Sequence, residues 1–155
     1  MPEIPAKVMA VLNARGLAPM EAAECSATVA QAAASFGVPE GSIAKSLLVK
    51  GKDGYAMIVM SGDKRLSNQK MRQLLGCRKV SMADRDTTFA LTGFPVGGVC
   101  PFGVDQAQVP VFIDESLRPY GIVYPACGTR TSCVKIEFSA LLEIASGRLC
   151  DVAEA

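Results

Sequence analysis

The chain has 155 residues, half of them apolar and a fifth charged, which is the balance of a compact globular domain. No apolar run approaches the roughly 20 residues that a transmembrane helix needs, which excludes a spanning segment. The absence of histidine excludes Ser-His-Asp and Cys-His catalysis. We therefore expect one domain over residues 1–155 whose chemistry rests on lysine, on main-chain dipoles or on the substrate itself.

The first half of the chain predicts two helices followed by a β-hairpin. The helices are expected over residues 5–15, ending at Gly16, and from a Ser26 cap to Phe36, ending at Gly37. After a turn at 39–41, strands are expected over 43–49 and 55–60, joined by the hairpin turn Asp53-Gly54.

The second half predicts short strands interrupted by helices. Strands are expected over 79–82, 109–113, 121–124 and 132–138, and helices over 67–75, 84–91 and from Ser139 to Gly147. This mixture predicts an α+β fold, with a curved mixed or antiparallel sheet or partial barrel surrounded by helices.

A glycine-rich loop lies between a predicted helix and a predicted strand. Residues 93–103 hold four glycines and two prolines in eleven positions, so they cannot continue a helix. The lack of side chains lets main-chain amides approach a ligand closely. From the residues alone this is a ligand-binding loop whose ligand is open.

Metal and cofactor sites have no support in the sequence. The six cysteines form no Cys-x-x-Cys pair and there is no histidine, which argues against structural zinc. No Gly-x-Gly-x-x-Gly or Walker motif indicates a nucleotide. We expect neither metal nor cofactor, and reduced, mostly buried thiols. Cys100 and Cys127 are the exceptions to watch, because both lie in loops of functional interest.

Charge is distributed unevenly although the net charge is only +1. Residues 45–85 carry ten Lys and Arg against three Asp, and acidic residues predominate on either side. Two interpretations remain open, a solvated surface or a footprint for the phosphates of a nucleic acid. The N-terminus lacks the basic region and apolar core of a secretory signal, so we expect a cytoplasmic protein.

An ordered set of short motifs resembles one family. The motifs cover nearly the whole chain and include Ala32–Pro39, Ile43-Ala44-Lys45-Ser46-Leu47-Leu48-Val49, Gly62–Leu66, Leu91–Pro95, Gly97–Gly103 and Val111–Leu117. They resemble the YbaK/EbsC-type aminoacyl-tRNA deacylases, free-standing relatives of the editing domain of bacterial prolyl-tRNA synthetase. Members hydrolyse the ester between a wrong amino acid and the 3′ end of tRNA, most often the tRNA for proline. The resemblance implies a mischarged tRNA as substrate, with Cys, Ala or another small residue attached, and prolyl-tRNA synthetase as a partner.

The resemblance also implies site residues. Lys45 matches the lysine that the family keeps in this strand, and its implied role is to bind the phosphate or hydroxyls of the terminal adenosine. A lysine that acts as base, or one that merely reaches solvent or pairs with a carboxylate, remains an alternative. The loop amides, Gly98 foremost, are implied to stabilise the oxyanion. The implied substrate contacts are Ser46, Gly97, Val99, Pro101, Gly128, Thr129 and Thr131.

The loop Cys127–Ser132 departs from the family's known forms. It matches neither the Gly-Gly-Arg-Arg-Gly-like form of Cys-specific members nor the Gly-Asn-Asn-like form of Ala-specific members. The resemblance therefore implies the reaction type and leaves the amino acid open. Two other functions are considered: a non-catalytic module that binds tRNA or a synthetase, and a cysteine-based redox protein. The oligomeric state is not predicted.

Overall fold

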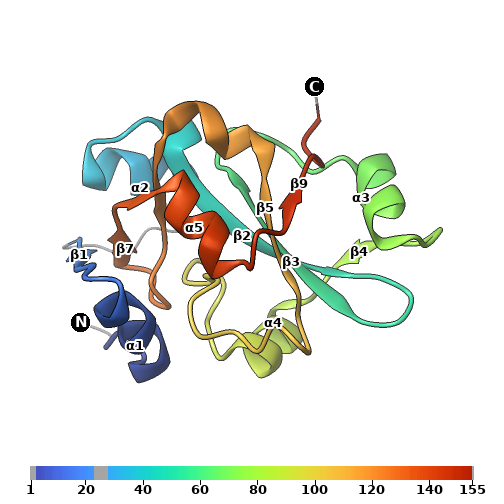
Figure 1. Ribbon diagram of the computed structural model, residues 1–155, viewed down its shortest axis with the longest axis horizontal. Helices are drawn as coiled ribbons and strands as arrows, with labels where there is room; N and C mark the ends of the chain where they lie inside the picture. Colours follow the sequence, from blue (N-terminus) through green and yellow to red (C-terminus); the bar gives the residue numbers. More distant parts are fainter. Residues whose placement is uncertain (1–2, 23–27, 155) are drawn as a thin grey trace.

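A curved β-sheet crosses the molecule, with β2 (Ile43–Lys50) and β3 (Tyr55–Ser61) at its centre (Figure 1). The computed structural model describes residues 3–22 and 28–154. The strand order is β8-β6-β2-β3-β5-β9, and β4 also pairs with β2. The outer strands are β4 (Ser81–Met82), β5 (Val111–Asp114), β6 (Ile122–Pro125), β8 (Ile136–Glu137) and β9 (Leu149–Cys150).

The sheet is mixed, as the α+β prediction allowed. β2 pairs antiparallel with β3 and β4, whereas β2 with β6, β3 with β5, and β5 with β9 are parallel. The predicted hairpin between β2 and β3 is confirmed, and the Gly51 amide donates to the Gly54 carbonyl at 2.8 Å across its turn. The parallel pairs need crossovers: α3 and α4 lie between β3 and β5, and α5 lies between β5 and β9.

Capping residues determine where most of the helices begin and end. They are α1 (Ala6–Ala14), α2 (Val29–Phe36), α3 (Asn68–Leu75), α4 (Arg85–Thr92) and α5 (Phe138–Ile144). Ser67 accepts from the Lys70 amide and begins α3, and Gly37, Gly76 and Gly93 end their helices in the left-handed conformation. The predicted Ser26 cap lies outside the described residues, and Thr28 caps α2. The prediction that Ser139 opens the last helix is wrong, because α5 begins at Phe138 after Glu137.

Several short elements were not predicted. β1 (Pro19–Glu21) pairs with β7 (Ser132–Val134), β9 pairs with β5, and 3₁₀ turns cover 40–42 and 115–120. The strand expected over 132–138 is divided into β7 and β8. Strands of two or three residues have no measurable periodicity, and pairing partners distant in sequence create them.

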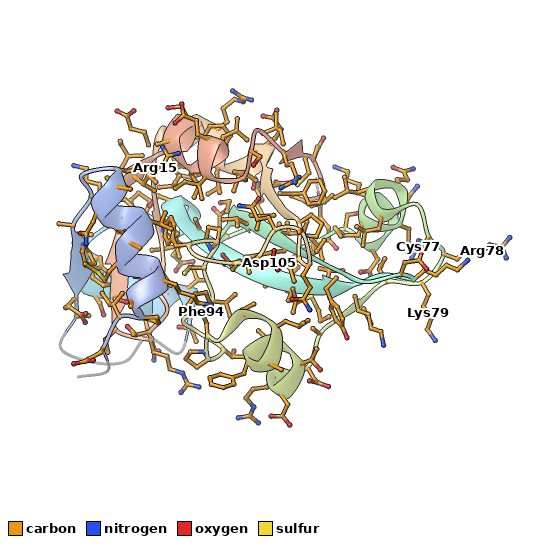
Figure 2. All side chains as sticks on the ribbon, turned by 60° about the horizontal axis from the view of Figure 1, so that its bottom comes forward. Arg15, Cys77, Arg78, Lys79, Phe94 and Asp105 are labelled. Carbon is orange, nitrogen blue, oxygen red and sulfur yellow. The ribbon has the colours of Figure 1, made fainter. Side chains whose placement is uncertain are left out.

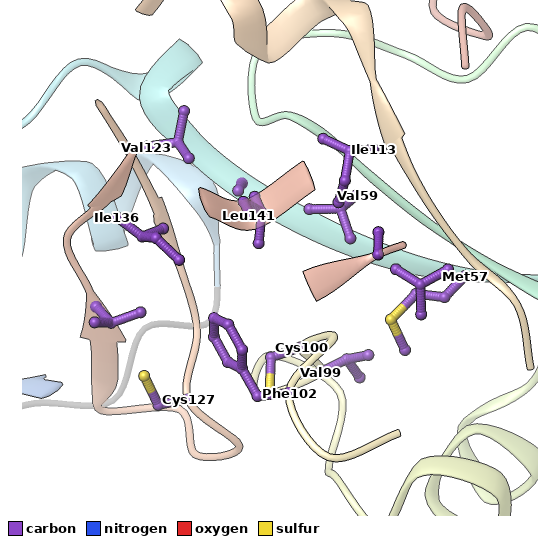
Figure 3. Close-up of a cluster of buried hydrophobic side chains, with 14 of the residues drawn as sticks. Met57, Val59, Val99, Cys100, Phe102, Ile113, Val123, Cys127, Ile136 and Leu141 are labelled. Atoms are coloured by element: carbon purple, nitrogen blue, oxygen red, sulfur yellow. The ribbon is translucent and has the colours of Figure 1, made fainter. Parts of the chain in front are cut away.

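Side-chain alternation along the central strands divides the core between two faces. Met57 and Val59 pack on the face that α1 and α5 cover, with Val99, Phe102 and Leu141 (Figure 3). Ile58 and Met60 point to the other face, beside Met71 of α3. The glycine-rich loop therefore belongs to the first core, since Cys100 and Phe102 are fully buried in it.

Candidate active site

A cavity lies where one edge of β2 has no strand partner. On this side β6 pairs only with residues 43–44, and β4 pairs only with residues 49–50. The gap between them opens into a cavity of about 410 Å³, a volume suited to a small organic group. Its walls come from β2, α2, β4, the glycine-rich loop and the loop before β7. The residues on which the argument below depends are Lys45, Ser46, Gly97, Val99 and Arg130.

Ser46 lines this cavity and has polar groups without partners. Its Oγ is buried and has no hydrogen-bond partner among the described residues. The Leu48 carbonyl faces the open edge, where it accepts from the Ala83 amide at 2.9 Å. Because main-chain groups alternate in direction along a strand, the N–H and C=O of Ser46 face the same edge. A buried hydroxyl without a partner is costly, so a ligand that pairs with it gains stability.

Lys45 forms the neighbouring part of the wall. Its ammonium donates to the Lys64 carbonyl, which leaves two N–H donors for a ligand. Burial lowers the pKa of Lys45 from its ordinary value, the Asp63 carboxylate opposes this shift, and the Arg65 guanidinium adds to it. Lys45 is thus a partly desolvated cation whose charge is easier to remove than that of a surface lysine.

The glycine-rich loop reaches the cavity through Gly97 and Val99, as the resemblance implied, but not through Gly98. The Gly98 amide donates to the Pro95 carbonyl at 2.9 Å within the loop. The Gly98 amide therefore already has an acceptor within its own loop, and its role as the oxyanion donor stays a prediction. Within the described part of the chain, the Gly97 and Val99 amides have no acceptor, and both residues line the cavity.

The lack of a side chain at Gly98 lets the glycine-rich loop pack against the loop before β7. A Cβ there would lie 2.8 Å from the Thr129 nitrogen and 2.9 Å from the Gly128 carbonyl carbon. Gly128 is also confined: it has φ +90°, and a Cβ on it would lie 2.8 Å from Pro5 Cδ. Because neither glycine has a side chain, the main chain of the glycine-rich loop can contact the main chain of the loop before β7. Pro101 is buried, and neither it nor Gly128 is part of the cavity lining, so their implied contact with substrate stays a prediction.

The hydroxyls of Thr129 and Thr131 hold their own loop in place. Thr129 Oγ1 lies 2.6 Å from Ser132 Oγ, and Thr131 Oγ1 donates to Glu21 Oε2 at 3.1 Å. Both threonines are buried and neither lines the cavity. Short polar side chains in a buried turn satisfy one another first, and the implied role of both threonines as substrate contacts stays a prediction.

Arg130, between these threonines, is a cavity residue that sequence reasoning missed. Its side chain is exposed, and its Nε donates to the Val96 carbonyl at 2.9 Å. None of the ion pairs among the described residues includes it. Its position next to a binding loop was the available signal, because an arginine in such a place suits an anionic ligand.

Lys7 of α1 contacts the glycine-rich loop through residues that do not line the cavity. Its ammonium donates to the Thr92 carbonyl at the end of α4 and lies 4.4 Å from the centroid of the Phe94 ring. At the other end of the loop, a Cβ on Gly103 would lie 2.8 Å from Lys7 Cγ. One side chain therefore contacts both ends of the loop.

The thiols near the cavity are not activated. Cys100 and Cys127 are fully buried, and burial raises the pKa of Cys100 to about 12 and that of Cys127 further. Cys133, in the cavity wall, also has its pKa raised by burial to about 12. A redox or nucleophilic cysteine needs an exposed thiol with a lowered pKa, whereas these three thiols are buried and have raised pKa values. Cys25 lies outside the described residues.

Groups of three or more His, Cys, Asp or Glu side chains placed to hold a metal ion do not occur over 3–22 and 28–154. The helices in these same ranges are all too short or too polar to cross a membrane.

The model of one protein family, the aminoacyl-tRNA editing domain, matches residues 23–144. The chain belongs to this family. The match contains Lys45, Ser46, the glycine-rich loop and Arg130, and it begins after α1. The resemblance found in the sequence motifs is therefore confirmed.

Comparison with individual relatives supports the assignment to the aminoacyl-tRNA editing-domain family. The Bacillus subtilis protein YwhH is 40% identical over 80% of this chain and 78% of its own length. The proline–tRNA ligase of Thermosipho africanus is 34% identical over 63% of this chain, but this is only 16% of the ligase. A crystal structure of a protein proposed as a trans-editing enzyme for prolyl tRNA synthetase superposes with a TM-score of 0.86 and 30% identity, covering 99% of this chain and 100% of that one.

Proposed function

We propose that this editing domain acts as a free-standing hydrolase on a mischarged aminoacyl-tRNA, with Cys- or Ala-tRNA for proline, or another small-residue tRNA, as substrate. The observation that carries the proposal is the set of unpaired polar groups on one cavity: the Ser46 hydroxyl and main chain, and the Gly97 and Val99 amides. Editing is needed because a synthetase pocket discriminates against a slightly smaller amino acid by only about 1–3 kcal/mol.

In this proposal Lys45 and Arg130 bind the terminal adenosine. Two free N–H donors of the Lys45 ammonium suit a phosphate oxygen or a ribose hydroxyl. The Arg130 guanidinium keeps its terminal nitrogens available while Nε is bound to Val96. The ester is thereby fixed at the open edge of β2, and the aminoacyl group enters the cavity.

The chemical step is attack of water on the ester carbonyl carbon. The Gly97 and Val99 amides donate to the developing oxyanion, and each well-placed donor contributes about 3–4 kcal/mol. The bond to the ribose oxygen then breaks, and that oxygen takes up the proton that the attacking water loses. Ser46 orients the substrate through its C=O, which can accept from the α-amino group, and its Oγ. In a cysteinyl substrate its own thiol can instead attack the carbonyl carbon: the S–C bond forms as the bond to the ribose oxygen breaks, that oxygen takes up the thiol proton, and water then hydrolyses the thiolactone.

Deacylation of a panel of mischarged tRNAs tests the proposal. Lys45→Ala and Ser46→Ala are compared with Lys135→Ala and Ser139→Ala, which replace the same residue types at exposed positions outside the cavity. We expect the cavity variants to lose at least tenfold in kcat/KM on the preferred tRNA and the controls to lose less than twofold. Full activity of Lys45→Ala at both saturating and subsaturating tRNA would contradict the role of Lys45.

Single-turnover measurements separate a hydrolase from a module that only binds tRNA. A hydrolase shortens the lifetime of the ester when the protein is in excess. A binding module leaves that lifetime unchanged or longer, and this outcome would overturn the proposed chemistry. Co-purification with prolyl-tRNA synthetase tests the further proposal that the synthetase is a partner.

A further inference from the structure

We propose that a second, cationic groove beside the active-site cavity binds the phosphates of the tRNA 3′ strand that leads into the cavity. The groove lies between the turn of the β2–β3 hairpin and residues 76–81, which connect α3 to β4, and has a volume of about 710 Å³. This inference rests on the proposed function, because it identifies the surface that holds the rest of the same substrate.

The lining of the groove is basic. Four of its eight residues carry positive charge, and none carries a carboxylate: Lys50, Lys52, Arg78 and Lys79. All four side chains are exposed, and Figure 2 shows Arg78 and Lys79 projecting from one end of the molecule. The ion pairs of the described residues involve other cations, so these charges remain available to a partner.

The acidic side chains near the groove do not neutralise it. Asp53 lies in the hairpin turn, and the Asp84 carboxylate is close enough to Lys50 for that charge to contribute to lowering the Asp84 pKa. The larger causes of the Asp84 shift are its hydrogen bonds to Thr87, which make it the cap of α4. The four cations of the lining therefore outnumber these two carboxylates, and Arg72 of α3 lies in an adjoining pocket that shares Gly76, Cys77 and Arg78.

The groove and the cavity meet at β4. Met82 lies in the cavity wall and pairs with Val49, whereas the preceding Ser81 lies in the groove and pairs with Lys50. Lys45 and Lys50 stand on the same strand, about 16 Å apart at the rise of an extended chain. Because side chains alternate along a strand, those of Lys45 and Lys50 leave opposite faces of β2. In this proposal the polyanionic strand leaves the cavity beside Lys45, crosses the short edge strand β4 between Met82 and Ser81, and meets the four cations.

The chemistry of the groove favours phosphates. Arg78 can bind a phosphate with two parallel hydrogen bonds, and the lysines act as point charges. Gly51 and Gly76 remove side-chain bulk from the lining, so an approaching strand meets little steric obstruction. An acidic protein surface is the other occupant that such charges could attract, and the experiment below distinguishes the two.

The test is a salt titration of tRNA binding with a triple variant, Lys52→Ala/Arg78→Ala/Lys79→Ala, and with Lys135→Ala as the control. Uncharged tRNA serves as probe, so the measurement does not depend on turnover. Each lost contact to a single-stranded phosphate lowers the slope of log Kd against log salt by about 0.7, so we expect a decrease of about 2. In deacylation we expect KM to rise at least tenfold while kcat at saturating tRNA stays within twofold.

The outcomes separate this inference from the proposed function. An unchanged slope and KM in the triple variant would overturn the groove while leaving the hydrolase intact. A shallower slope in a protein without deacylase activity would support the groove and overturn the hydrolase. Unchanged tRNA binding together with lost binding to an acidic synthetase would assign the groove to a protein partner and overturn the inference.

Crosslinking gives a second measurement that does not require a weakened variant. Cys77 lies in the groove and is half-buried, whereas the other described cysteines are buried. A photoreactive group attached to Cys77, in a Cys25→Ser background, should crosslink to nucleotides at the 3′ end of tRNA. Crosslinks confined to the anticodon half of the tRNA, or none with bound tRNA, would contradict the inference.

Discussion

The Nε of Arg130 donates to the main-chain oxygen of Val96 over 2.9 Å, across a sequence separation of 34 residues. This bond joins the loop before β7 to the glycine-rich loop at the mouth of the cavity. Behind it, the two loops are in main-chain contact at Gly98 and Gly128. Arg130 therefore fixes the Gly97 and Val99 amides from the solvent side while its terminal nitrogens stay free.

Two replacements of Arg130 should distinguish the effect of its positive charge from the effect of its forked hydrogen-bonding geometry. In Arg130→Ala we expect kcat/KM for mischarged tRNA to fall about 10- to 100-fold, or about 1.4–2.7 kcal/mol of transition-state stabilisation. Arg130→Lys keeps the charge without the forked geometry, so it should restore KM more than kcat. The melting temperature checks folding and should change little, because the side chain is exposed. Equal recovery of kcat and KM by lysine would contradict the bridging role.

The pH dependence of activity should reveal how Lys45 acts. Its pKa is lowered by burial, so the ammonium loses its proton at a lower pH than a surface lysine does. If the cation binds substrate, kcat/KM falls as the pH rises through this lowered pKa. We expect that fall at a lower pH than the deprotonation of a surface lysine, after subtraction of spontaneous ester hydrolysis, and we expect Lys45→Arg to remove it. A rise of kcat/KM over the same range that Lys45→Arg abolishes would indicate a general base instead.

Gly98→Ala should damage both stability and activity. The added Cβ would meet main-chain atoms of Gly128 and Thr129 at 2.8–3.0 Å, and main chain cannot rotate away. We expect a loss of about 1–3 kcal/mol in the free energy of unfolding, measured by urea titration. Gly54→Ala is the matched control, because a Cβ there has open space. A stable Gly98→Ala variant with normal kcat would show that the two loops do not need this close contact.

Alkylation of the thiols should be selective. At pH 8 we expect a maleimide or iodoacetamide to modify Cys77 and to spare Cys100 and Cys133, whose pKa values burial raises to about 12. Mass spectrometry of the digested protein in a Cys25→Ser background measures this, and denaturant should expose every thiol. Rapid native-state modification of Cys100 with loss of deacylation would instead favour a functional cysteine.

Much of the fold could be predicted from sequence because its signals are local. Ser67 and Asp84 begin helices, Gly37, Gly76 and Gly93 end them, and the hairpin turn was also predicted. The pairing of β1 with β7 and of β9 with β5 could not be predicted, because it depends on segments that meet only in the folded chain. The same holds for the division of 132–138 into two strands.

The cavity lining was predicted in part, and the predicted residues outside the lining have a feature in common. The motifs placed Lys45, Ser46, Gly97 and Val99 in one region, and all four line the cavity. Gly98 stands between Gly97 and Val99 in sequence, and Gly128, Thr129 and Thr131 flank Arg130. Their amide, hydroxyls or lack of a side chain serve contacts within and between the two loops. Sequence proximity shows which loops form a site. It does not show which groups within a loop are already satisfied.

The contacts of Lys7 have a consequence for transplanting this site. The region shared with the editing-domain family begins at residue 23, whereas Lys7, which contacts Thr92, Phe94 and Gly103, precedes it. A chimera that carried only residues 23–144 into another protein would acquire every cavity-lining side chain named above and would leave this cation behind. Its glycine-rich loop would then depend on whatever the recipient placed against Phe94.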